Sequence, residues 1–305
     1  MTPQSNRTAY IELHSAVFLF GFTGILGRLI TLDATVLVWH RMWLTAIFMF
    51  FLVKITKKWH AVAWKDLVRV AFISSFIAIH WVLFYASIKL AGVSLAMVCL
   101  SSISLFTAFL EPLILKTKFS PIQFVFALLA ILGVYIMASG QLDQLYGILI
   151  GLASAFFSAL FTVFNKRILP KFRPRMLSFI EMSFGFVVLS ILLPIFSIFF
   201  PMDFSMPAIN DWVYLLILSL FCTVLAFNLS LNSLSSLSAY TVNLAINLEP
   251  VYGIILAFII FKEYELLGPG FYVGTMFILL AVVGDVIWKR FGKNIVARTA
   301  PGSQP

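Results

Sequence analysis

The sequence predicts an all-α integral membrane protein with ten transmembrane helices. Hydrophobic side chains make up 62% of its 305 residues and charged ones only 11%, with a mean hydropathy of +1.04. Soluble domains contain roughly 45–50% apolar residues, so a soluble fold could not bury this surface. The apolar runs are also continuous, as in 212–248, whereas barrel strands alternate apolar and polar residues. These two observations favour a helical membrane bundle and exclude a large soluble domain.

Charged and turn residues divide the chain into the ten expected helices. Each has about the 20 apolar residues that a membrane-spanning helix needs. They fall near 11–31, 36–53, 68–88, 92–115, 121–140, 145–165, 176–199, 211–231, 238–261 and 269–288.

Basic residues predict the orientation of these helices. With the N-terminus in the cytoplasm, the cytoplasmic segments hold 17 of the 21 Lys and Arg residues. The outer segments hold three, Arg28, Lys89 and Lys262, and Arg41 lies in a span. Because Lys and Arg concentrate in cytoplasmic loops, both termini are expected in the cytoplasm. The net charge of +9 is then a consequence of topology and does not indicate a nucleic-acid partner.

The chain contains a tandem repeat of roughly 145 residues. Short matches recur at a slowly growing offset: Phe22-Thr23 with Phe161-Thr162, Asp66 with Asp211, Phe106 with Tyr252, and Lys116 with Lys262. Five helices per copy is an odd number, so the second copy enters the membrane from the opposite side. Inverted repeats of this kind are typical of transporters, whose substrate site lies near the midplane between the halves.

The repeat defines the expected domains. Residues 1–142 form the first five-helix repeat, 143–292 the second, inverted repeat, and 293–305 a cytoplasmic tail. Cys99 and Cys222 both lie in apolar runs, so neither a disulfide framework nor a metal site is expected.

The second copy carries the segment Asn247-Leu248-Glu249-Pro250-Val251-Tyr252, followed by Phe261-Lys262-Glu263. This segment resembles the Glu-Pro helix and acidic turn of the EamA-like branch of the drug/metabolite transporter superfamily, and Arg41 resembles the Arg that commonly opens the second helix of that family. The first copy departs from the pattern, with Ser104 near the position of Pro250 and Thr117 near that of Glu263. The resemblance implies a ten-helix transporter of small metabolites, with export as its direction and no cofactor.

Ionisable groups inside spans are costly and therefore mark candidate functional residues. Glu249 is the candidate for proton coupling, since burial favours the protonated form of a carboxyl group; the alternative is a hydrogen bond to a neighbouring helix. Arg41 and Glu181 occupy equivalent positions in the two halves, where opposite charges would suit a zwitterion. The further cavity-lining candidates are His80, Trp81, Tyr85, Asn228, Asn243 and Asn247.

The predicted function is secondary transport of small organic metabolites such as amino acids, by alternating access, in a bacterial inner membrane. The expected partners are a small-molecule substrate and the lipid bilayer, without nucleic acid, and the chain is expected to be a monomer or a homodimer. A facilitative channel and a nucleotide-sugar or sugar-phosphate carrier are the alternatives. A membrane enzyme is disfavoured because the sequence contains no H-E-x-x-H or G-x-S-x-G motif and only four widely spread His residues. Without a P-loop, the chain itself is not expected to hydrolyse ATP.

Overall fold

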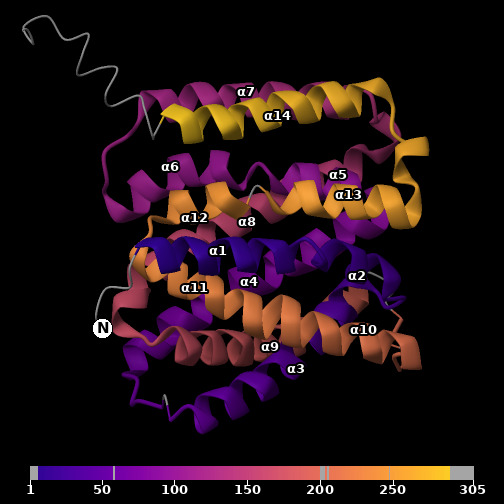
Figure 1. Ribbon diagram of the computed structural model, residues 1–305. Helices are drawn as coiled ribbons and strands as arrows, with labels where there is room; N and C mark the ends of the chain where they lie inside the picture. The colour runs from indigo at the N-terminus through magenta and orange to yellow at the C-terminus, as the bar shows by residue number, and fades with distance from the viewer. Residues whose placement is uncertain (1–5, 58, 200–202, 205, 247, 289–305) are drawn as a thin grey trace, which may run out of the picture.

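The computed structural model describes residues 6–57, 59–199, 203–204, 206–246 and 248–288, which form a bundle of helices without strands. Successive long helices run in alternate directions, so their connections gather at two ends of the bundle (Figure 1). We call the end where the chain begins the N-terminal face and the other end the opposite face. The α-helices are α1 (Asn6–Phe20), α2 (Thr23–Leu29), α3 (Ala34–Ile55), α4 (Trp64–Ala91), α5 (Val93–Leu100), α6 (Ile103–Leu115), α7 (Pro121–Ser139), α8 (Leu145–Ile168), α9 (Pro174–Phe199), α10 (Ile209–Ser219), α11 (Ala226–Ser236), α12 (Ala239–Ile246), α13 (Glu249–Phe261) and α14 (Pro269–Ile287).

Helices of membrane-spanning length confirm the predicted class of fold. Seven helical segments are long and apolar enough to cross a bilayer, among them Trp64–Ala91 and Ile209–Ser236. Three shorter apolar helices, Phe124–Ser139, Glu249–Phe261 and Pro269–Ala281, lie within the remaining expected spans. The protein is therefore an all-helical membrane protein, and ten crossings remain a prediction.

Several helices that the sequence predicts as continuous are interrupted. Gly21-Phe22 separates α1 from α2, Ser101-Ser102 separates α5 from α6, and α13 begins three residues after the end of α12. Between α10 and α11 the chain forms a π-helical segment, η3 (Leu220–Leu225). A short π-helical segment is rare and often marks a functional site. The apolar runs continue across these breaks, so hydropathy alone did not show them.

The two copies of the repeat share their backbone landmarks. Lys116 and Lys262, which match in sequence, end α6 and α13 in the left-handed conformation, with φ of 56° and 53°. The end of α5 at Leu100 and the end of α12 at Ile246 have the same sequence offset as these lysines, and so do the starts of α6 and α13. The sequence repeat therefore corresponds to a repeat of structure, including the interruption of its fourth helix.

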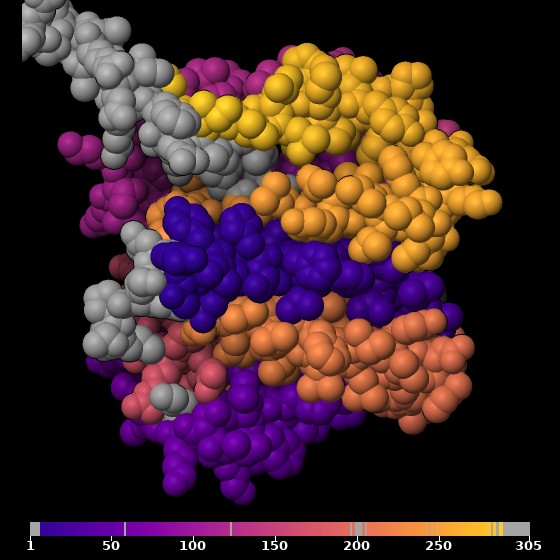
Figure 2. Space-filling view, in the orientation of Figure 1, coloured from indigo at the N-terminus to yellow at the C-terminus, as the bar shows by residue number. Residues whose placement is uncertain are grey.

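Helices from the two copies interleave instead of forming separate lobes. Here α4 packs on α8, α3 on α9, α7 on α14, and α1 on α11. In Figure 2, α1 fills the space between α11 on one side and α12 and α13 on the other. The interrupted helices also pair across the copies, α5 with α13 and α6 with α12. The centre of the bundle is therefore enclosed by both copies.

Candidate functional site

A cavity of about 70 Å³ lies in the centre of the bundle, where helices of both copies meet. Such a volume holds several water molecules, since one needs only about 10–15 Å³. Five aromatic rings line it, from Phe20, Trp81, Phe84, Phe161 and Phe227. The polar lining consists of Thr23, Arg41, His80, Ser158, Thr162, Cys222, Thr223, Ser230 and Glu249. The lining thus combines one cation, one carboxyl group and aromatic walls.

The helix interruptions converge on this cavity. Residues on both sides of three breaks line it, and η3 contributes two more. They are Phe20 and Thr23 from α1 and α2, Leu100 and Ile103 from α5 and α6, Ile246 and Glu249 from α12 and α13, and Cys222 and Thr223 from η3. Helix ends leave backbone groups without intrahelical partners, and transporter sites are typically formed at such discontinuous helices. The backbone breaks and the cavity are therefore one structural feature.

Arg41 is a buried cation that neutral groups hold in place. Its Nε donates to Thr223 Oγ1 at 2.9 Å and its Nη1 to Tyr85 Oη at 2.8 Å. The guanidinium carbon lies 3.8 Å from the centroid of the Trp81 ring, in cation–π contact. Only 2% of the residue is exposed, and no carboxylate of the described chain forms an ion pair with it. A buried charge without a counterion is costly, so this site is suited to an anionic group.

Glu249 is the carboxyl group of the cavity and the first residue of α13. Thr23 Oγ1 lies 3.3 Å from its Oε1 and 2.7 Å from the carbonyl oxygen of Phe20. A hydroxyl group has a single proton, and the shorter contact with Phe20 competes for it. The 3.3 Å contact is that of a hydroxyl donating to Glu249, and the same distance also fits a protonated Glu249 that donates to Thr23. The geometry accommodates Glu249 in either protonation state.

His80 lines the cavity and is held by Ser154 through one ring nitrogen. Its Nδ1 lies 3.0 Å from the Ser154 carbonyl oxygen, and Ser154 Oγ donates to the His80 carbonyl oxygen at 2.9 Å. Together with the 2.8 Å contact between Nδ1 and Ser154 Oγ, these contacts fit the tautomer in which Nδ1 carries the proton. In the neutral ring, Nε2 is then an acceptor. His80 is thus able to accept a hydrogen bond from a ligand.

Comparison with known proteins identifies the family. A sequence profile of the EamA-like transporter family matches residues 8–139 and 145–285, and so covers both copies of the repeat. The chain belongs to the EamA-like transporter family. The resemblance inferred from the Glu249-Pro250 segment and Arg41 is thereby confirmed.

Two individual comparisons agree with this family. The EamA-like protein is 31% identical over 159 residues to the uncharacterized transporter YetK of Bacillus subtilis (strain 168), and the match covers 49% of this chain. It spans about half the length of that relative, 47%. A solved structure, described only as a crystal structure of a protein, superimposes with a TM-score of 0.66 at 14% identity. The superposition covers 91% of this chain and 96% of the other, and shows a shared fold.

The predicted site residues of this EamA-like protein fall into two groups. Arg41, His80, Trp81 and Glu249 line the cavity, and Tyr85 is fully buried behind Arg41. The remaining candidates lie elsewhere, as follows. Glu181 on α9 is fully buried with Asn165 facing it, Asn228 donates to the Val224 carbonyl oxygen, Asn243 donates to Thr107 Oγ1, and Asn247 lies outside the described residues.

Sequence analysis missed several cavity residues, although one signal was available. Thr23 and Thr162 both line the cavity, and they belong to the Phe-Thr pair that recurs in the two copies. Cys222 and Thr223 had no comparable signal, because the π-helical segment that presents them is not visible in the sequence. No group of three metal-ligating side chains occurs among the described residues.

Proposed function

We propose that the protein is a secondary transporter of small zwitterionic metabolites, amino acids or related compounds, which it exports by alternating access. The observation that carries this proposal is the presence of Arg41 and Glu249 in one cavity with aromatic walls. A substrate carboxylate pairs with the guanidinium of Arg41, and its ammonium group lies at Glu249. The zwitterion bridges two charges that form no ion pair with each other in the described part of the chain.

Glu249 also couples transport to protons in this proposal. A carboxylate in this cavity binds either a proton or the substrate ammonium group, because both occupy the same oxygen atoms. Binding of substrate thus displaces a proton, and return of a proton displaces the substrate. The contact between Thr23 and Glu249 supports this exchange, because its distance is compatible with both protonation states of Glu249.

The proposed topology has both termini in the cytoplasm and the two copies as inverted five-helix repeats in a bacterial inner membrane. The basic turns support this orientation. Lys54 lies in the last turn of α3 and Lys57 follows it, Lys116 follows α6, and Lys171 and Arg173 lie between α8 and α9, all at the N-terminal face. The Bacillus relative supports a bacterial membrane. Opposite charges in the cavity distinguish this proposal from a sugar-phosphate carrier, which would need several cations there.

The experiment is counterflow in proteoliposomes loaded with a mixed amino-acid pool, with and without an imposed pH gradient. We expect saturable exchange that disappears when the transported amino acid is omitted. Saturation and exchange would exclude a channel, which passes solute without either. Absence of exchange across the whole pool would overturn the amino-acid proposal, and uptake of sugar phosphates in its place would support the alternative carrier class.

A further inference from the structure

In two places a carboxyl group of one copy of the repeat accepts hydrogen bonds from the first turn of a half-helix in the other copy. Glu263, just after α13, accepts from the backbone N–H groups of Val93 at 2.9 Å and Ser94 at 2.7 Å, which begin α5. Glu111 on α6 accepts from the N–H of Tyr240 at 2.9 Å, in the first turn of α12. Ser94 and Tyr240 are repeat-related positions. The first N–H groups of a helix lack intrahelical partners, so a carboxylate there fixes the helix end.

Glu263 joins three segments at the opposite face. Besides the two amide groups of α5, it forms an ion pair with Arg28, in the last turn of α2. The Arg28 guanidinium carbon also lies 4.4 Å from the centroid of the Phe261 ring at the end of α13. Glu263 is only 4% exposed, so its contacts with the amide groups of α5 are shielded from water, whereas the Arg28 side chain is 36% exposed. We call Arg28, Val93, Ser94 and Glu263 the Glu263 clasp.

Each segment in the clasp leads directly to the cavity. Thr23 at the start of α2, Leu100 at the end of α5 and Glu249 at the start of α13 all line it. The three half-helices also pack on one another. They therefore form a wall between the cavity and the opposite face, with helix breaks at the cavity end and Glu263 at the other.

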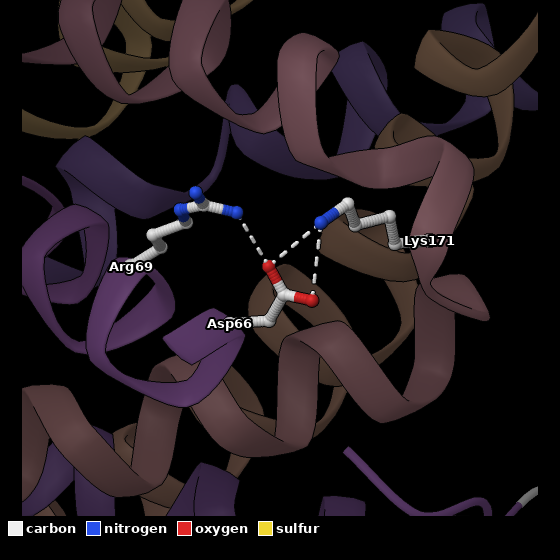
Figure 3. A network of polar contacts seen from close by, with 3 residues as sticks. All are labelled: Asp66, Arg69 and Lys171. Atoms are coloured by element: carbon white, nitrogen blue, oxygen red, sulfur yellow. Dashed lines mark hydrogen bonds and ion pairs between the residues drawn. The ribbon is translucent and has the colours of Figure 1, made fainter. Parts of the chain in front are cut away.

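A second pair of repeat-related contacts shows that the two faces are closed differently. At the opposite face, buried Asp211 accepts from the N–H of Thr31 at 2.8 Å and from its hydroxyl at 2.7 Å. At the N-terminal face, Asp66 pairs with Lys171 at 2.9 Å and with Arg69 at 2.8 Å (Figure 3). The Lys171 side chain is 53% exposed, and exposed ion pairs contribute little. At this pair of repeat-related positions the opposite face therefore has the more buried contact.

We propose that Glu263 is the gate residue of the opposite face. Its clasp closes the path from the cavity to that face, and opening requires Glu263 to release α5 and Arg28, so that the three half-helices move about their breaks. This assignment rests on the proposed transport function. The two proposals can be tested separately, because access to the cavity can be measured without any substrate.

Cys222 is a native reporter of this access, because it lines the cavity, whereas Cys99 is fully buried outside it. The protein is reconstituted in a Cys99→Ser background, and a tag at the N-terminus reports the orientation. A membrane-impermeant maleimide is then added at one face at a time. The labelled fraction of Cys222 is obtained by comparison with the labelling of the same protein after denaturation. Glu263→Gln retains one acceptor for α5, and Glu263→Ala retains none. Glu265→Gln is the matched control, since Glu265 is exposed in the same turn.

We expect labelling from the opposite face to rise in the order wild type, Glu263→Gln, Glu263→Ala. For Glu263→Ala the rise should be about 10-fold or more, because this variant loses hydrogen bonds to a charged group, which are the strong ones. Glu265→Gln should match wild type. Equal labelling in all four proteins, or labelling that rises as much in Glu265→Gln, would overturn the assignment. Thermal unfolding of each variant in detergent shows whether it is folded.

A charge exchange separates the helix-end contacts from the ion pair. In Arg28→Glu/Glu263→Arg, the ion pair is restored, but an arginine cannot accept from the amide groups of α5. We expect the double variant to remain open to the opposite face; closure equal to wild type would overturn the role given to those amide groups. If Glu263 variants open as expected while amino-acid counterflow is absent from wild type, the amino-acid transport proposal fails and the gate assignment stands.

Discussion

The fourth helix of each copy is interrupted at the same place but carries different chemistry. Ser101, Ser102 and Ile103 form the break between α5 and α6, whereas Leu248 and Glu249 precede Pro250 at the break between α12 and α13. Both breaks line the cavity, yet only the second places a carboxyl group there. The repeat has thus kept the backbone geometry in both copies and the ionisable group in one.

The second helices of the two copies differ in the same way. Arg41 on α3 and Glu181 on α9 are equivalent in sequence, and both are almost fully buried. Arg41 lines the cavity, whereas Glu181 lies away from it with Asn165 facing it. The cavity therefore receives its cation from the first copy and its carboxyl group from the second. A symmetric scaffold gives an asymmetric site.

The largest effect is expected from removal of the cation. Arg41→Ala should raise the substrate concentration for half-maximal counterflow by about 10- to 100-fold, because hydrogen bonds to charged groups are the strong ones. Arg41→Lys keeps the charge but loses the planar fork that binds a carboxylate at two points, so an intermediate value is expected. The concentration dependence of counterflow measures both. If folded Arg41→Ala had the wild-type half-saturating concentration, Arg41 would have a structural role and would not bind substrate.

Replacement of the carboxyl group tests proton coupling. Glu249→Gln has no group that exchanges a proton, so stimulation of transport by a pH gradient should be lost, and transport should no longer vary across a pH series. Ile103 holds the equivalent place in the first copy, and Ile103→Leu is the matched control, expected to keep the pH response. Normal transport of Glu249→Gln over the whole series would contradict the role of Glu249.

Glu181→Gln tests whether the asymmetry is real. Because Glu181 does not line the cavity, the half-saturating substrate concentration should stay at the wild-type value, in contrast to Arg41→Ala. The change is isosteric and leaves an amide group facing Asn165. Counterflow measures the effect, with the same protein preparation tested for thermal unfolding. A large rise in half-saturation at unchanged stability would place both equivalent positions in substrate binding.

Sequence reasoning predicted the class of fold and part of the site, for identifiable reasons. Apolar runs indicate spans because the bilayer imposes their length, and buried charges such as Arg41 and Glu249 stand out because they are costly in a bilayer. A spacing of four residues gives a face of a helix, but not the neighbour of that face. Asn243 therefore could be assigned to the cavity, although its amide bridges the copies by a hydrogen bond to Thr107 at 2.8 Å. The π-helical segment that presents Thr223 depends on tertiary packing and had no signal at all.

A test of the sign of the effect comes from the two prolines that follow a glutamate, in Glu111-Pro112 and Glu249-Pro250. Pro250 lies in the first turn of α13, where its missing N–H has no intrahelical role, whereas Pro112 lies inside α6. Pro250→Ala should lower stability by about 0.4–1 kcal/mol, since proline restricts the unfolded chain.

Pro112→Ala is the matched control and should raise stability, because proline inside a helix removes a hydrogen bond and costs about 3 kcal/mol at most sites. Denaturant unfolding in detergent measures both changes. If Pro250→Ala were also stabilising, the proline itself would interrupt an otherwise continuous helix. The expected opposite signs would instead mean that the break before Glu249 is made by packing against the other copy, as it is at Ser101-Ser102, where no proline is present.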